Sequence, residues 1–334
     1  MRVRRNWTIL MTVACCVALV ACGQQAPVEE TDPFEAVQQA YRDAETGEEW
    51  LPTAWAFLEE HPENEHVPWV TARVLYHQVH DMDDPEGAVD VVMSALDRAT
   101  DPEVRFEVAT QVADEAADLG RTVDLAAIVD DLVGVRPLTF NDNLELMEAA
   151  SEFGEWELVH SAAAAGLEQA TPEAYRADHP DRELTDDEAR ESADLRRGLA
   201  LSWLGWAQFQ EGGVDESMAT FEQAAAVMPT NYFGVAGEPL PRLWGQALLA
   251  SSVPEDGLQM LVAADLFAGD EEAKKIVEPI LAERGDADAI LSAVRDRFAR
   301  PLDDVTVADY DGEMHSLAQL REDKVMLLAF WFPT

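Results

Sequence analysis

Residues 198–231 read GLALSWLGWAQFQEGGVDESMATFEQAAAVMPTN and are the most informative part of the chain for its fold. Apolar and small residues recur at steps of three and four in both halves of this stretch, as amphipathic helices require. Gly212 lies between the two halves and Pro229 follows the second one, and both residue types are typical of helix ends. The spacing therefore predicts two helices joined by a short turn.

The residues at which these two helices would meet form a pattern. Its members are Leu204, Gly205, Ala207, Phe209, Phe221, Ala224 and Pro229. The pattern resembles the tetratricopeptide repeat, in which small residues let two antiparallel helices approach and large residues fill the groove between them. Gln208 and Ser217 depart from it, because an aromatic residue and an alanine are usual there. The resemblance implies stacked helix pairs, whose concave surfaces bind peptides or proteins.

Helical periodicity extends on both sides of this unit and predicts a mainly α-helical domain over residues 34–300. The expected helices, with the two of this unit included, cover 34–46, 49–60, 66–80, 85–98, 102–119, 123–133, 141–153, 156–169, 188–211, 214–227, 241–250, 255–267, 271–283 and 287–298. Residues 171–187 are more polar and no helix range is assigned to them, although Thr171-Pro172 has the form of a helix start. The stretch 86–99 resembles the second helix of another repeat, but the remaining units are degenerate. We favour a tetratricopeptide-like array over an irregular bundle that holds one repeat.

The first 21 residues have the features of an export signal. Three arginines precede an apolar run over 8–20 that is too short to span a bilayer comfortably. The following Leu19-Val20-Ala21-Cys22-Gly23 resembles the lipobox of bacterial lipoproteins, which implies cleavage before Cys22 and acylation of its thiol. Gly23 resembles the residue found there in lipoproteins sent to the outer membrane. The alternative is an ordinary signal peptide or an uncleaved anchor that contains a cysteine.

We therefore expect a signal peptide over 1–21, a lipidated cysteine and flexible tether over 22–33, and a location in the cell envelope facing the periplasm. Cys15 and Cys16 would leave with the signal and Cys22 would carry lipid, so no residue of the mature stretch could do thiol chemistry.

The chain is strongly acidic. It holds 66 Asp and Glu against 23 Lys and Arg, and loss of three signal-peptide arginines would give 20 − 66 = −46. Such a charge repels phosphate groups, so nucleic acid is excluded as a partner. Two interpretations stay open, a solvated acidic surface or an acidic face that captures a basic partner or cations.

The pattern changes after residue 303. Residues 305–308 favour a strand, 309–312 a turn, 316–320 a short helical turn, and the apolar run up to Trp331 a strand buried on both faces. This order resembles the start of the thioredoxin-like domain of TlpA/ResA-type thiol–disulfide oxidoreductases and related redoxins of the AhpC/TSA type. The residues in register are Asp311, Gly312, Ser316, Leu317, Leu320, Lys324, Val325, Phe330 and Trp331; Asp323 replaces the usual glycine.

The resemblance implies that residues 301–334 begin a thioredoxin-like domain and stop short of its active site. In the reductases a Cys-x-x-Cys pair follows Phe-Trp, so the first catalytic cysteine is expected beyond Thr334, and no cofactor is implied. We expect the longer protein to be an enzyme and this chain not to be one. Trp331-Phe332-Pro333 also resembles the motif before the peroxidatic cysteine of peroxiredoxins, which is one alternative. A non-catalytic lipoprotein scaffold is the other.

Two further groups of residues have structural explanations. His77 and His80 are spaced by three with acidic residues nearby, but a metal site needs more converging ligands, so we predict solvated helix polars and no metal. Trp203 and Trp206 are predicted to be core residues, although they could line a peptide groove. The expected partners are envelope proteins or peptides, bound by the helices, and the membrane, reached through the lipid.

Overall fold

The computed structural model describes residues 32–231, 234–298, 306–308 and 313–316. The described part is mainly α-helical, as predicted, with sixteen α-helices, two short π-helical segments and a sheet of two strands. Cys22 and the expected signal peptide lie outside the described residues. No helix of the described part is both long and apolar enough to cross a membrane.

The helices follow one another with short connections. Those of the first half are α1 (Pro33–Asp43), α2 (Gly47–Glu60), α3 (Val67–Tyr76), the π-helix η1 (His77–Asp81), α4 (Pro85–Arg98), α5 (Pro102–Gln111), α6 (Ala113–Asp118) and α7 (Leu125–Val133). Those of the second half are α8 (Phe140–Glu152), α9 (Trp156–Gln169), α10 (Pro172–Asp178), α11 (Asp186–Gln210), α12 (Val214–Val227), α13 (Leu240–Leu249), α14 (Pro254–Ala263), the π-helix η2 (Ala264–Ala268), α15 (Glu271–Glu283) and α16 (Ala287–Phe298).

Most of these helices agree with the predicted ranges to within a few residues, but one predicted helix is divided and one further helix lies in a stretch to which no range is assigned. The helix expected over 102–119 is interrupted at Val112, which separates α5 from α6. The polar stretch 171–187 contains the short helix α10, which begins with Pro172 and is capped by Thr171, whose Oγ1 accepts a hydrogen bond from Ala174 N at 3.1 Å. Helix α10 buries none of its residues, so it carries no apolar stripe that periodicity could detect.

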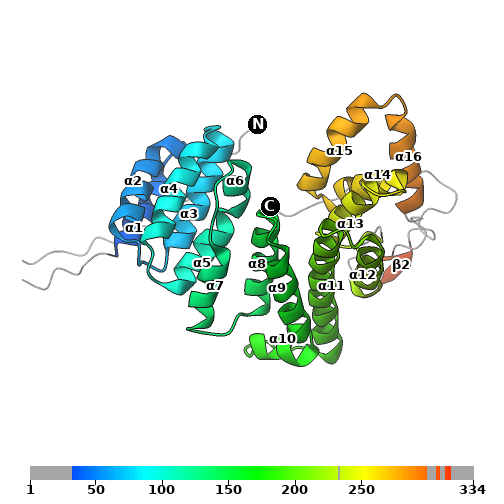
Figure 1. Cartoon of the computed structure of the whole chain (residues 1–334), viewed down its shortest axis with the longest axis horizontal. Helices are drawn as coiled ribbons and strands as arrows, with labels where there is room; N and C mark the ends of the chain where they lie inside the picture. Colours follow the sequence, from blue (N-terminus) through cyan, green and yellow to red (C-terminus); the bar gives the residue numbers. More distant parts are fainter. Residues whose placement is uncertain (1–31, 232–233, 299–305, 309–312, 317–334) are drawn as a thin grey trace, which may run out of the picture.

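Residues 198–231 contain the predicted helix pair, made of the C-terminal part of α11 and of α12 (Figure 1). Gly205 allows the close approach, since a Cβ there would lie 3.0 Å from the buried ring of Phe221. The two departures from the repeat pattern both form hydrogen bonds between the helices. Ser217 Oγ donates to the carbonyl of Gly205 at 2.8 Å, and Thr220 Oγ1 donates to Gln208 Oε1 at 2.7 Å.

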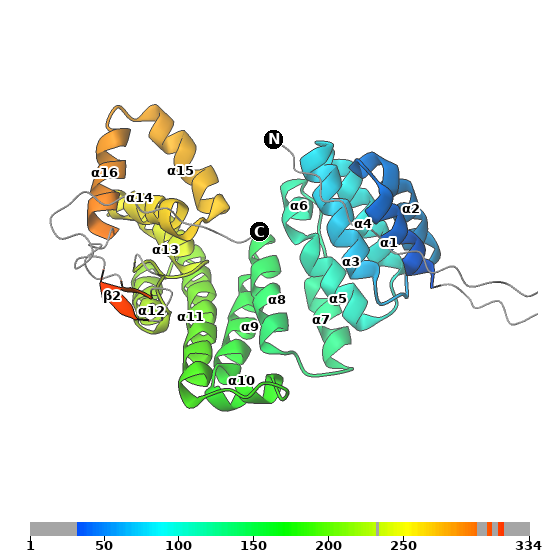
Figure 2. The same ribbon diagram turned by 180° about the vertical axis from the view of Figure 1, so that it is seen from behind.

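The helices are arranged largely in chain order from one end of the molecule to the other (Figures 1 and 2). Helices α1–α7 form one side, α8 and α9 the middle, and α11–α16 the other side. One apolar core runs from Phe34 to Ala247, and a second, smaller core joins Val235 to α14, α15 and α16. The array is therefore continuous through its middle, and its C-terminal helices have a core of their own.

The sheet pairs β1 (Thr306–Ala308) with β2 (Met314–Ser316) in antiparallel orientation, Thr306 opposite Ser316. The predicted strand over 305–308 is confirmed for its described part. Ser316 ends a strand and does not begin a helical turn, so that part of the prediction is wrong. The remaining redoxin-like positions lie outside the described residues; they are Asp311, Gly312, Leu317, Leu320, Lys324, Val325, Phe330 and Trp331.

Candidate functional site: an acidic cleft lined by tryptophans

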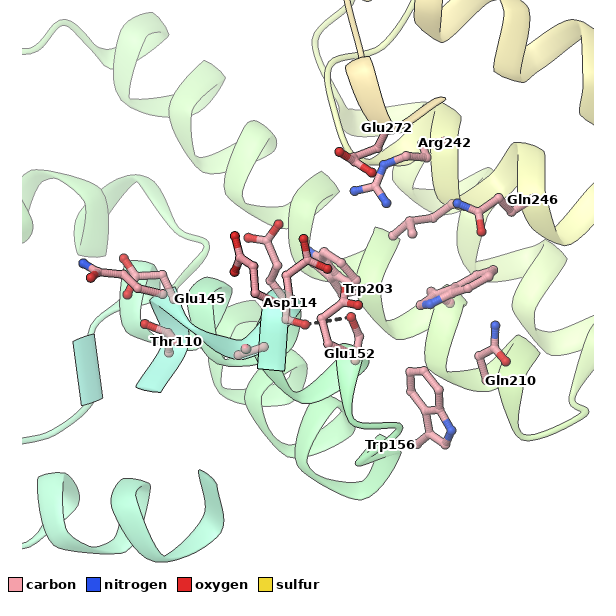
Figure 3. Close-up of a pocket in the computed structure, with 18 of the residues that line it drawn as sticks. Thr110, Asp114, Glu145, Glu152, Trp156, Trp203, Gln210, Arg242, Gln246 and Glu272 are labelled. Atoms are coloured by element: carbon pink, nitrogen blue, oxygen red, sulfur yellow. Dashed lines mark hydrogen bonds between the residues drawn. The ribbon is translucent and has the colours of Figure 1, made fainter. Parts of the chain in front are cut away.

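A cleft of about 970 Å³ lies between the two sides of the helical array. Its walls come from α5, α6, α8, α9, α11, α13 and α15, so helices from both halves of the chain contribute. Among its described lining residues are eight carboxylates, one guanidinium group and three indoles. Figure 3 shows Asp114, Glu145 and Glu152 on one side of this space, with Trp156 and Gln210 across from them.

Helix α8 supplies the centre of the acidic wall. Glu145, Glu148 and Glu152 are spaced by three and four residues, which places them on one face of the helix. A capping box at Thr139 and Asp142 fixes the start of α8, and the opposite face is buried in the main core. The other carboxylates of the cleft are Glu107, Asp114, Glu115, Asp142 and Glu272.

The protein around the cleft raises the pKa of most of these carboxyl groups. The surrounding protein displaces hydrating water, and this raises the pKa of Glu152 to about 6, with the charge of Asp114 adding to the effect. The same loss of hydration raises the pKa of Asp114, and neighbouring Asp118 and Glu272 raise it further. The carboxylates of Glu107, Glu115, Glu145 and Glu148 also have raised pKa values, with desolvation as the main cause. The cleft is thus an unfavourable environment for the negative charges of these carboxylates.

Asp142 is the exception, because it has its own counter-ion. Burial raises its pKa, but hydrogen bonds from Arg136 and Thr139 outweigh burial and leave the pKa below its usual value. Arg136 Nη1 lies 2.6 Å from Asp142 Oδ2, and Arg136 Nε lies 2.7 Å from Glu103 Oε1. This arginine joins α5 to α8 and pairs with none of Glu145, Glu148 and Glu152. Lys275 pairs with Glu272, with Nζ 2.6 Å from Oε1.

The opposite wall is aromatic. Trp203, Trp206 and Gln210 follow one another at the same three- and four-residue steps along α11, and Trp156 begins α9. Trp203 is only 3% exposed, so the prediction of a core residue is confirmed for it, although its edge reaches the cleft. Trp206 is half-buried and stacks on Phe209 with ring centroids 5.8 Å apart. The helix therefore presents indole surface to the cleft while it packs against its neighbours.

Arg242 on α13 is the single cation among the described lining residues. Its Nε lies 3.4 Å from Oδ2 of Asp270, a buried residue that caps α15 by accepting a hydrogen bond from Ala273 N. Figure 3 shows Arg242 and Glu272 on the same side of the cleft, facing the carboxylates of α6 and α8. The pair between Arg242 and Asp270 links α13 to α15 and so holds Glu272 at the edge of the cleft.

The residues predicted from sequence lie elsewhere or fulfil a structural role. The repeat residues Gly205, Ala207, Phe221 and Ala224 are buried, and Leu204 is half-buried, in the packing of α11 with α12 and their neighbours. Pro229 lies just after α12, outside the cleft.

The predicted histidine pair is not fully solvated. The side chain of His77 is 17% exposed, with Nδ1 2.5 Å from Asp81 Oδ2 and its ring against Trp50. Among the described residues no group of three or more His, Cys, Asp or Glu side chains has the geometry of a metal site.

Sequence reasoning missed the acidic face of α8, although a signal for it exists. Like charges at three- and four-residue spacing destabilise an isolated helix, so Glu145, Glu148 and Glu152 lower the intrinsic stability of α8. The overall abundance of Asp and Glu hid this run. The assembly of the site from seven helices could not be read from any one of them.

Comparison with known proteins gives no relative from which a function could be transferred. No protein-family model, no curated protein and no solved structure matches the chain.

Proposed function

We propose that this chain is the helical binding platform of an exported lipoprotein, and that the platform holds a segment of a partner polypeptide in the cleft. The cleft is the observation that carries this proposal, since its volume of about 970 Å³ suits several residues of a peptide. Its lining offers charged groups, amides and indoles, which together suit a polypeptide better than an apolar small molecule.

The fold suits the same role. The helix pair α11 and α12 supports a tetratricopeptide-like array, because its close approach at Gly205 is the one that the repeat pattern requires. Arrays of this kind bind ligands on extended concave surfaces. The lipobox at Cys22 supports anchoring at a membrane surface outside the cytoplasm.

The platform is tested with panels of basic, neutral and acidic heptapeptides, added to the protein without its signal peptide. Binding is measured by tryptophan emission and by isothermal titration calorimetry. We expect at least one panel to change the emission, and we expect Trp206→Leu to abolish that change while the exposed Trp55→Leu on α2 preserves it. If no panel binds at the cleft, the platform proposal is wrong.

A second proposed function concerns the longer protein. We propose that thiol–disulfide exchange takes place in a thioredoxin-like domain that begins near residue 301, and that the platform delivers its substrates. The redoxin-like sequence block supports this, as does the antiparallel pairing of β1 with β2, between which Asp311 and Gly312 lie in the sequence. A first cysteine thiolate would attack a substrate disulfide, and a second cysteine would resolve the mixed disulfide, which reduces the substrate and oxidises the cysteine pair.

The downstream reading frame separates the possibilities. A Cys-x-x-Cys pair after Thr334 predicts reduction of insulin disulfides by the extended product. A single cysteine predicts reduction of hydroperoxides, as in a peroxiredoxin. If the extended product has neither activity, the redox proposal is wrong, and a lipoprotein scaffold would account for the platform by itself.

A further inference from the structure

We infer that the cleft recognises an arginine side chain of the bound segment, held with its guanidinium group between the indoles of α9 and α11 and the carboxylates of α8. This inference rests on the proposed platform and adds the chemistry of its ligand. The occupant is an extended polypeptide that carries arginine next to apolar residues.

The two walls of the cleft supply complementary halves of a site for a planar cation. Trp156 and Trp206 are half-buried, so each exposes part of an indole to the cleft. A guanidinium group stacks on such a ring and donates several hydrogen bonds in its own plane, which suits carboxylates such as Glu148 and Glu152. Lysine has a compact charge and cannot stack in this way.

The chain itself contains an example of this arrangement. Arg196 on α11 lies 4.7 Å from the ring centroid of Tyr175 and 4.8 Å from that of Phe140, while its Nη1 is 2.6 Å from Asp178 Oδ2. Its side chain is 8% exposed, so rings and a carboxylate enclose it. Arg73 is a second case, stacked 3.6 Å from the ring centroid of Trp69.

The cleft has the same rings and carboxylates without the arginine. Within the described part of the chain, no arginine is stacked on Trp156, Trp203 or Trp206. Arg242 is paired with Asp270, and Arg136 is paired with Asp142 and Glu103. A guanidinium group from outside would complete the arrangement.

The charge balance favours the same occupant. Eight carboxylates and one guanidinium group are among the described lining residues of the cleft. Two of these carboxylates have a cationic partner, Asp142 in Arg136 and Glu272 in Lys275, so the acidic groups remain in excess. Burial is the main cause that raises the pKa of Asp114 and of Glu152, and the charge of Asp114 raises that of Glu152 further, so a bound cation would stabilise these carboxylates. The carboxylates do not converge as metal ligands do, so a larger organic cation fits the arrangement better than a metal ion.

The test uses three blocked heptapeptides, Ala-Arg-Ala-Leu-Ala-Arg-Ala and its versions with both arginines replaced by lysine or by glutamine. Affinity is measured by calorimetry at low and at high salt. We expect the arginine peptide to bind at least about fivefold more tightly than the lysine peptide, and the glutamine peptide to bind at least about fiftyfold more weakly than the arginine peptide. High salt should weaken the lysine peptide more, since stacking is less screened than charge attraction.

Matched variants separate the cleft from the acidic surface in general. Trp206→Leu and the double variant Glu148→Gln/Glu152→Gln should each weaken the arginine peptide at least about tenfold. Trp55→Leu and Glu222→Gln, at exposed positions that do not line the cleft, should leave its affinity within about twofold. Circular dichroism checks that every variant is folded.

Equal affinity for the arginine and lysine peptides, or equal weakening by cleft and control variants, would overturn the inference, because either result means attraction by surface charge alone. Binding of neutral or acidic peptides at the cleft would also overturn it while leaving the platform proposal intact.

Discussion

Two regions of this molecule bring aromatic rings and carboxylates together, and they differ in whether the chain fills the space between them. At the junction of α8, α10 and α11, Arg196 lies beside Phe140 and Tyr175 and pairs with Asp178. At the cleft, other residues of α8 and α11 present the same kinds of groups to open space. Helices α8 and α11 therefore help to enclose an arginine at one place and present rings and carboxylates to a cleft at another.

The two arrangements have different consequences for the stability of the fold and for ligand binding. A cation enclosed by rings and a carboxylate stabilises the fold and cannot exchange for a ligand. Carboxylates left without a counter-ion destabilise the fold and can be stabilised by a ligand. We therefore expect substitutions in the first region to lower stability and those in the second to lower binding, and three predictions test this.

The largest effect on stability should come from Arg196→Leu. This change removes the cation–π contacts and leaves Asp178 without its partner, at a cost of about 2 kcal/mol in the free energy of unfolding. Trp206→Leu keeps an apolar side chain at a half-buried position and should cost less than about 1 kcal/mol. Urea unfolding of both variants measures the difference. If Trp206→Leu is the more destabilising of the two, the indole belongs to the fold and the contrast between the regions fails.

The next effect concerns the close approach of α11, which carries the cleft tryptophans, to α12. Gly205 lies between Trp203 and Trp206 in the sequence of α11. Gly205→Ala would place a Cβ 3.0 Å from the buried ring of Phe221, so we expect the free energy of unfolding to fall by about 1 kcal/mol despite the better helix propensity of alanine. Gly166→Ala on α9 is the matched control. Its Cβ would meet neighbours at 3.6 Å, an ordinary contact, so this variant should gain up to about 1 kcal/mol.

Thermal and urea unfolding compare these two glycine variants. Opposite signs are expected, and a stabilised Gly205→Ala would show that α11 and α12 are not held at the close distance described.

The smallest effect is a dependence on pH. In the folded protein the pKa of Glu152 is raised to about 6, above its value in the unfolded chain, and those of five other cleft carboxylates are raised as well. Between the unfolded and folded values the native state binds more protons, so these groups make stability fall as pH rises from about 4.5 to about 6. Binding of the arginine peptide should change in the opposite direction and weaken as pH falls through about 6, because protonation removes the charges that hold it.

Urea unfolding and calorimetry at a series of pH values check both trends, with Glu152→Gln as the variant that should reduce each slope. A stability that rises over this interval would mean that other groups dominate and that the cleft carboxylates are not under mutual repulsion.

Much of the fold follows from local sequence patterns. The helices over 85–98, 156–169, 214–227, 271–283 and 287–298 begin and end where periodicity and capping residues predict. Their start signals are local, for example proline in the first turn of α4, so no tertiary information was needed. The pairing of α11 with α12 was also predictable, because Gly205 and Phe221 are complementary in size.

The tertiary structure alone brings the cleft together. Glu107, Glu148, Trp206, Arg242 and Glu272 belong to different helices, and no spacing along the chain relates them. Whether an acidic residue faces open solvent or a cleft depends on how neighbouring helices pack, which composition cannot reveal in a chain with 66 acidic residues. The pairing of Arg196 with Asp178 and of Arg242 with Asp270 is likewise a product of packing, and neither arginine forms an ion pair with Glu145, Glu148 or Glu152 of α8.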